Sequence, residues 1–201
     1  MTVTPETVLD FWLGDHPSQP AVLETKQKLW FQKSFETDRT IADTFVTTLA
    51  DLAAGEAKTW AKNGARSRLA AIIVLDQFSR NIFRGHRFSF THDPMAKNLT
   101  LTGLAFNEDR ELSEVERVFF YLPLEHSESL DDQKMSVKLF EELAREARPA
   151  FKDFCETTLD YARKHLEVIE RFGRFPHRNA VLRRPSTREE QAYLSEPGAG
   201  F

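Results

Sequence analysis

The sequence has little cysteine, little glycine and no long apolar run, and each shortage excludes a class of protein. Its single cysteine, Cys155, rules out an internal disulfide and a cysteine-based zinc cluster. No apolar run approaches the length that spans a bilayer, and residues 1–15 do not resemble a secretory signal peptide. We therefore expect a cytoplasmic protein without a membrane partner.

Several catalytic signatures are also missing. We find no HExxH zinc motif, no Glu-x-x-His di-iron pair, no Walker loop, no nucleophile elbow and no dinucleotide fingerprint. The net charge of -4 does not favour binding to bulk nucleic acid. The content of 41% hydrophobic and 29% charged residues is typical of globular proteins. The sequence therefore predicts an ordinary globular chain for which no cofactor and no metal is expected.

Arginine and phenylalanine are present in excess. The chain contains 17 arginines against 10 lysines, and 17 phenylalanines against three tyrosines and three tryptophans. The planar guanidinium group of arginine recognises carboxylates and phosphates, whereas lysine supplies a mobile point charge. The positions of the arginines are therefore the best guide to a site.

Apolar residues recur at spacings of three and four through almost the whole chain, which is typical of helices. The run LAAIIVL at residues 69–75 has no polar face and should lie at the centre of the fold. An apolar stripe from Phe151 to Phe172 predicts one long helix, on which Cys155 is a core residue and not a nucleophile. We predict an all-α fold of antiparallel helical hairpins, arranged as a superhelix or an irregular bundle.

Capping signatures mark the starts of two predicted helices. Ser113 with Glu116, and Thr187 with Glu190, match the capping box. Pro123 is expected to bend or end the helix that follows Ser113, because proline lacks the backbone N–H that a helix interior needs.

A first polar turn follows the apolar run, in the sequence DQFSRNIFRG at residues 76–85. Ionised groups at a buried helix end need partners. Arg80 and Arg84 are four residues apart, so both could reach Asp76 or a bound anion. Two roles stay open for this turn: a buried Asp76–Arg80 pair that locks the helix end, or an anion site that includes Asn81.

A second polar turn, RFGRFPHRN at residues 171–179, also contains Arg-Asn and supplies His177 and Asn179. Five arginines without an acid occur in it and just after it: Arg171, Arg174, Arg178, Arg183 and Arg184. Such a cluster is repulsive unless it meets carboxylates elsewhere or an anionic ligand, and both remain open. We expect one all-helical domain over residues 1–201, with an Arg-rich extension, 173–201, packed on it.

The third candidate is the segment PLEHSE, which begins at Pro123. If the helix resumes after this proline, Glu125 and Glu128 share a face while His126 points inward. An acid beside an imidazole suits proton transfer or one edge of a metal site. A hydrogen-bonded core histidine is the alternative, and the same choice applies to His165 on the long apolar stripe.

Together, LDQFSRNIFRG, PLEHSE and RFGRFPHRN resemble the motifs of a bacterial family known as domain-of-unknown-function family 924. The likeness extends from DFW at residues 10–12 to STREE at residues 186–190, and it departs at Ser79, where the family often has proline. The resemblance implies a tetratricopeptide-repeat-like (TPR-like) fold and a shared site, but no activity. The residues at the motif positions are Arg80, Asn81, Arg84, Glu125, His126, Glu128, Gln133, His165, Arg174, His177, Arg178 and Asn179.

Three functions are compatible with these motifs. The first is a binding module in which four arginines hold a carboxylate, a phosphate or an acidic peptide end: Arg80, Arg84, Arg174 and Arg178. The second is an enzyme for a small anionic substrate, with Glu125 or His126 as acid or base. The third is an internal salt-bridge network that fixes the fold. A common pocket favours the first two, and complete burial with every donor satisfied favours the third.

Overall fold

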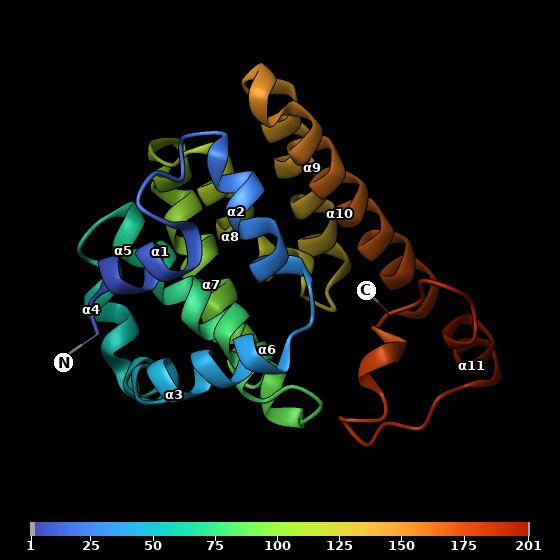
Figure 1. Cartoon of the computed structure of the whole chain (residues 1–201). Coiled ribbons are helices and arrows are strands. Elements are labelled where there is room, and N and C mark those ends of the chain that lie inside the picture. The colour runs from blue at the N-terminus through green and yellow to red at the C-terminus, as the bar shows by residue number, and fades with distance from the viewer. Residues whose placement is uncertain (1–2, 201) are drawn as a thin grey trace.

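The computed structural model describes residues 3–200, which form helices joined by short loops (Figure 1). The α-helices are α1 (Pro5–Leu13), α2 (Ala21–Phe31), α3 (Phe35–Asp51), α4 (Ala57–Ala61), α5 (Ala65–Ile73), α6 (Ser79–Ile82), α7 (Asp93–Ala105), α8 (Glu114–Glu125), α9 (Leu130–Glu146), α10 (Lys152–Phe172) and α11 (Arg188–Leu194). Shorter pieces are the π-helical turns η1 (Leu52–Glu56) and η2 (Val74–Phe78) and the 3-10 turns η3 (Arg87–Phe90), η4 (Glu108–Glu111), η5 (Pro149–Phe151) and η6 (Pro176–Arg178). No strand occurs within residues 3–200, so the predicted all-α fold is confirmed.

The main core surrounds α5, which packs against α1, α4, α7 and α8. Every residue of the run 69–75 is completely buried, as its lack of a polar face predicted. Aromatic side chains close the core at the end of this helix, where the Phe78 ring lies 5.4 Å from Trp12 and 4.7 Å from Phe45. The polar residues that follow Leu75 are therefore delivered to the edge of a dense apolar core.

The helix that leads to the first polar turn is not regular. After Ile73 the α-helix changes into the π-helical turn η2, with Asp76 at its centre, and then into the single α-helical turn α6. A π-turn is rare and often marks a functional site. It sets the direction in which the residues after Phe78 face.

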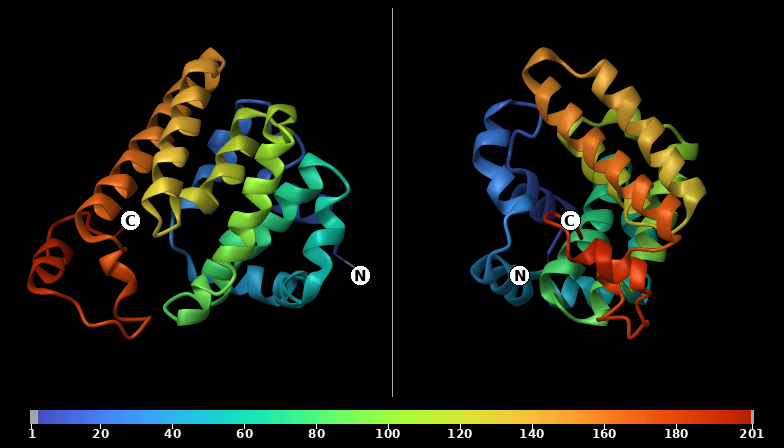
Figure 2. Two further views of the ribbon diagram at one scale, coloured as in Figure 1. Left: turned by 180° about the vertical axis from the view of Figure 1, so that it is seen from behind. Right: turned by 90° about the vertical axis from the view of Figure 1, so that its right-hand side faces the viewer.

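Helices α9 and α10 form a long antiparallel hairpin that packs against α8 at one side of the molecule (Figures 1 and 2). Cys155 is buried in α10 as predicted, and burial raises the pKa of its thiol to about 12. The helix ends at Gly173, which has a φ of +66°. Glycine adopts this left-handed conformation without a steric penalty and lets the chain turn back.

The capping boxes of α8 and α11 are both present, as the sequence predicted. Pro123 does not end α8, which continues to Glu125. A proline removes one backbone hydrogen bond, and a helix can lose one near its end. The loop that joins α8 to α9 therefore begins at His126.

The segment after Gly173 runs through η6 to α11 and lies beside the end of α10 (Figure 2). It contributes to a small apolar cluster of its own, built on Val168, Ile169 and Phe175. The division of the chain into a domain and an extension stays a prediction. Within residues 3–200, no helix combines the length and the apolar character needed to cross a membrane.

Candidate functional site

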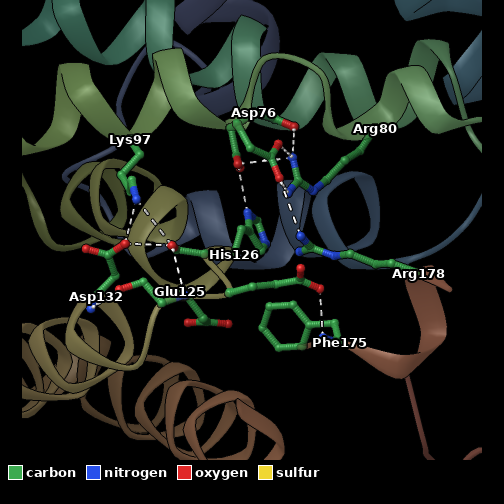
Figure 3. A network of polar contacts seen from close by, with 12 residues as sticks. Asp76, Arg80, Lys97, Glu125, His126, Asp132, Phe175 and Arg178 are labelled. Atoms are coloured by element: carbon green, nitrogen blue, oxygen red, sulfur yellow. Dashed lines mark hydrogen bonds and ion pairs between the residues drawn. The ribbon is translucent and has the colours of Figure 1, made fainter. Parts of the chain in front are cut away.

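Polar and charged side chains from five parts of the chain meet beside the main core (Figure 3). The turn η2 supplies an aspartate, α6 an arginine, α7 an aspartate, the end of α8 a histidine and η6 an arginine. We call this group the polar cluster: Asp76, Arg80, Asp93, His126 and Arg178. It brings the first and second polar turns into contact with each other and with the PLEHSE segment.

Asp76 is the most buried member of the polar cluster. Its Oδ1 atom lies 2.8 Å from Nδ1 of His126 and 3.1 Å from Nη1 of Arg80. Burial alone raises the pKa of this carboxyl, but the charge of Arg80 and the contact with His126 outweigh burial and hold the pKa below its usual range. The buried Asp76–Arg80 pair that the sequence suggested is therefore present.

The guanidinium group of Arg80 donates most of its hydrogen bonds to groups of the same chain. Its two Nη atoms donate to the two carboxylate oxygens of Asp93, each at 3.0 Å, and Nη1 also donates to the backbone carbonyl of Asp76 at 2.7 Å. A bidentate pair of this kind fixes both side chains. Arg80 thus joins η2 to the start of α7.

Arg178 has a different environment. Its guanidinium group lies between the rings of Phe90 and Phe175, 4.6 and 4.5 Å from their centroids. Nη1 is 3.6 Å from Oδ2 of Asp93, and buried Nε has no hydrogen-bond partner within residues 3–200. Burial, followed by the nearby charge of Arg80, lowers the pKa of Arg178 to about 10. This buried cation is held in position by rings instead of by hydrogen bonds.

Glu125 and His165 form a second buried pair next to the polar cluster. Nδ1 of His165 donates to the carbonyl of Tyr161 at 2.9 Å and lies 3.2 Å from Oε1 of Glu125. Burial, with the charge of Asp76, raises the pKa of Glu125 to about 8, and burial, with His126 nearby, lowers the pKa of His165 to about 3. Both side chains are therefore neutral at pH 7.

The polar cluster touches solvent at its rim. The side chains of Arg80, Asp93 and His126 are 19%, 17% and 15% exposed. A cavity adjoins the cluster on the side of Phe90, but neither Glu125 nor His126 lines it. The predicted common pocket of all three motifs is thus a common cluster with an open rim.

Two residues of the first turn point away from the polar cluster. Arg84 does not reach Asp76 but forms a bidentate pair with Asp38 of α3, with Nη2 and Oδ1 2.7 Å apart. Nδ2 of Asn81 donates to the same oxygen at 2.8 Å. The reason is the orientation of α6, which packs against α3. The possibility that both Arg80 and Arg84 reach Asp76 is therefore wrong for Arg84.

Most arginines of the second turn meet carboxylates of the same chain. Arg174 donates to both oxygens of Glu190, at 2.6 and 2.8 Å, and Arg171 pairs with Glu189 at 3.0 Å. Asn179 bonds to Ser186 and accepts from Arg184, so it holds its own loop. These residues, placed in the candidate site by the sequence, instead fasten the C-terminal segment.

Glu125 and Glu128 do not share a helical face, because α8 ends at Glu125. Glu128 lies in the loop, where it binds Arg184 through both oxygens and accepts from the backbone N–H of Phe175 at 2.8 Å. Nε2 of Gln133 donates to the carbonyls of Glu125 and Ser127, at 2.5 and 2.7 Å, and so satisfies the end of α8. Glu128 and Gln133 thus position the loop.

His177 is half-buried in the second turn. Its ring centroid is 5.6 Å from that of Phe175, and burial, with the charge of Arg178, lowers its pKa to about 4. No group of three or more His, Cys, Asp or Glu side chains within residues 3–200 is arranged to hold a metal ion.

Sequence reasoning missed two residues of this site, Asp93 and Phe90. Asp93 precedes Pro94 and looks like an ordinary residue at a helix start, and Phe90 is one of 17 phenylalanines. Both contact the arginines only through tertiary packing. The sequence indicated only that Arg178 needs a partner outside its own acid-free segment. It did not indicate which residues provide that partner.

Comparisons with other proteins agree with the resemblance of the motifs. A family model described as "Bacterial protein of unknown function (DUF924)" matches residues 8–198. A solved structure of a protein of unknown function from Agrobacterium tumefaciens, ATU0120, is 34% identical and has a TM-score of 0.79, covering 95% of this chain and 96% of that chain. No curated protein matches the chain.

Proposed function

The chain belongs to the DUF924 family of bacterial proteins of unknown function, and from its polar cluster we propose that it binds a small anionic ligand. The ligand presents a carboxylate or phosphate group to Arg178, with Arg80 and His126 beside it. One observation carries the proposal: Arg178 is a buried guanidinium group that makes no hydrogen bond to any residue in 3–200.

A buried cation without hydrogen bonds costs free energy, which a suitable ligand reduces. Phe90 and Phe175 fix the plane of the Arg178 guanidinium group, so little conformational freedom is lost when an anion binds. A carboxylate or a phosphate matches the donor spacing of arginine with two parallel hydrogen bonds. Arg80 is already bonded to Asp93 and contributes its charge.

The charges of the polar cluster balance before any ligand binds. Asp76 and Asp93 are negative, and Arg80 and Arg178 are positive, so an anion adds an uncompensated charge. His126 faces Asp76, and burial, with the charge of Arg80, lowers its pKa, which leaves it neutral at pH 7. We therefore expect His126 to take up a proton when the anion binds, and the affinity to be higher at pH 6 than at pH 8.

The test is a thermal-shift and calorimetric titration with acetate, inorganic phosphate and an acidic dipeptide at constant ionic strength. We expect at least one of these anions to stabilise the protein, and Arg178→Met to remove the effect. Arg84→Met is the matched control, because Arg84 is bound to Asp38 and should leave the titration unchanged. The proposal fails if none of the anions stabilises the protein or if Arg178→Met binds them equally well.

A second candidate function is acid–base catalysis on the bound anion. The observation that favours it is the 2.8 Å contact between Asp76 and Nδ1 of His126, which leaves Nε2 of His126 to accept a proton. Neutral Glu125 beside it can donate one. His126→Gln should then still bind an anion found by titration, without the gain in affinity at pH 6, but abolish its turnover, followed by NMR. If the bound anion is recovered unchanged from the wild-type protein, this function is excluded.

Two finer expectations accompany the proposal. We propose that the hairpins follow a TPR-like arrangement, supported by the resemblance of the motifs, and that the protein acts in the cytoplasm. Superposition of α7–α10 on helical repeats tests the first, and fractionation of bacterial cells tests the second.

A further inference from the structure

We propose a second ligand subsite, separate from the polar cluster, that binds an organic phosphate or carboxylate with an apolar body. It is a groove between η3 and the loop before α11, with a cavity volume of about 390 Å³. We call it the outer groove; its lining residues are Arg87, Phe90, Thr91, Val181, Leu182 and Arg183. The two sides of the groove are about ninety residues apart in the sequence.

The strongest argument is the pairing of the arginines. All 17 arginines lie within the described residues, and 14 of them form an ion pair with a carboxylate of the same chain. Three form no ion pair with any residue in 3–200: Arg87, Arg183 and Arg188. Two of these three line the outer groove, Arg87 in η3 and Arg183 in the loop before α11, and the guanidinium group of Arg87 lies 5.7 Å from the Phe88 ring centroid. In a chain with net charge -4, this leaves a local excess of positive charge at one small cavity.

The backbone at Arg183 supports the same interpretation. Arg183 has a φ of +55°, which is unfavourable for a residue with a side chain. The turn is anchored on one side by the backbone bond from Arg184 to Asn179, at 2.8 Å, and by the bidentate pair of Arg184 with Glu128. Strained residues of this kind persist where the surrounding structure holds them, often at ligand sites. Here the strained turn places Arg183 in the lining of the groove.

The remaining walls define the class of ligand. Phe90, Val181 and Leu182 provide an apolar surface, and Thr91 provides a hydroxyl group. The cavity volume lies at the lower end of the range for small-molecule sites, so the ligand is a small molecule and not a folded partner. Two arginines that line a cavity together with an apolar surface suit an anion attached to an aromatic or branched body.

The probe is phenyl phosphate, compared with inorganic phosphate and benzyl alcohol by calorimetry at constant ionic strength. Arg87→Asn and Arg183→Asn each remove one charge, and asparagine tolerates the left-handed backbone at residue 183. We expect each substitution to weaken phenyl phosphate binding by about tenfold. Inorganic phosphate should bind more weakly than phenyl phosphate, and benzyl alcohol should not bind.

Arg188→Asn is the matched control, because it removes the third unpaired arginine outside the groove, and it should leave the affinity unchanged. Arg178→Met should remove only phenyl phosphate binding at the polar cluster and leave the binding that depends on Arg87 and Arg183, which separates the two sites. Circular dichroism checks that each variant folds. The proposal is overturned if the double variant of Arg87 and Arg183 binds as tightly as the wild type, if Arg188→Asn weakens binding equally, or if Arg178→Met abolishes it.

Discussion

The two Arg-Asn turns contain similar residues but are bonded very differently. In the first turn, Arg80 binds two aspartates and a backbone carbonyl, and Arg84 forms a bidentate pair with Asp38. In the second, Arg174 is equally well paired with Glu190, but Arg178 has one carboxylate at 3.6 Å. The role of an arginine therefore depends on partners from other segments and not on the motif around it.

The two turns also differ in the size of the apolar core on which they pack. The first turn lies on the main core, where Phe78 packs against Trp12 and Phe45. The second lies on the small cluster of Val168, Ile169 and Phe175. A fully bonded turn over a large core acts as a structural lock, and a turn with an unsatisfied cation over a small core has capacity left for a ligand. Three substitutions test this contrast.

Asp76→Ala should give the largest effect. It leaves the half-buried Arg80 and His126 without the buried carboxylate that they share, and breaking a buried pair in this way costs about 3–5 kcal/mol of unfolding free energy. Asp38→Ala is the control at the exposed end of the same turn, and it should cost at most about 1 kcal/mol. Urea unfolding measures both. Equal losses would mean that the first turn is not locked at Asp76.

Glu125→Gln should give the next largest effect, and it depends on pH. The folded-state pKa of Glu125 is raised to about 8, whereas the unfolded chain has an ordinary glutamate. Between about pH 4.5 and pH 8, the unfolded chain loses this proton first, so the wild type loses stability as the pH rises. Glutamine does not ionise.

The variant should therefore match the wild type at pH 4 and exceed it by about 4 kcal/mol at pH 8. Denaturant unfolding at a series of pH values measures the difference. Glu128→Gln should show no such gain, because Arg184 and the N–H of Phe175 lower the pKa of Glu128 against the effect of burial. If the difference in unfolding free energy between Glu125→Gln and the wild type does not change with pH, Glu125 is ionised in the folded protein.

Arg178→Met should give the smallest change in stability. The pair with Asp93 at 3.6 Å contributes little, and a methionine fills much of the space between Phe90 and Phe175. We expect a loss of about 1 kcal/mol or less, from the lost stacking of the cation on the rings. Thermal and urea unfolding check it. If Arg178→Met loses as much unfolding free energy as Asp76→Ala, Arg178 is as important for stability as Asp76. The two turns would then not differ in their structural role.

Local features of the fold were predictable from the sequence. Helical spacing and the capping box at Ser113 depend on neighbours three or four residues away, and so does the Asp76–Arg80 pair. The burial of residues 69–75 followed from the absence of a polar face.

The partners that decide each role were not predictable. Arg84 binds Asp38, 46 residues away, and Arg178 lies on Phe90 beside Asp93. Such contacts depend on how helices pack, and a single sequence with 31 acidic residues offers many possible partners for each arginine. For the same reason, the sequence does not show that Arg87 and Arg183 line the same groove.

Because of the π-turn at Val74–Phe78, the direction of the side chains in the first Arg-Asn turn depends on the number of residues between 74 and 78. Its backbone hydrogen bonds join residues five apart instead of four. The side chains after it are therefore rotated about the helix axis by about 100° relative to an unbroken α-helix. In a chain one residue shorter here, Arg80 and Arg84 would face away from Asp93 and Asp38. Among relatives, a single deletion between residues 74 and 78 should therefore accompany the loss of both aspartates.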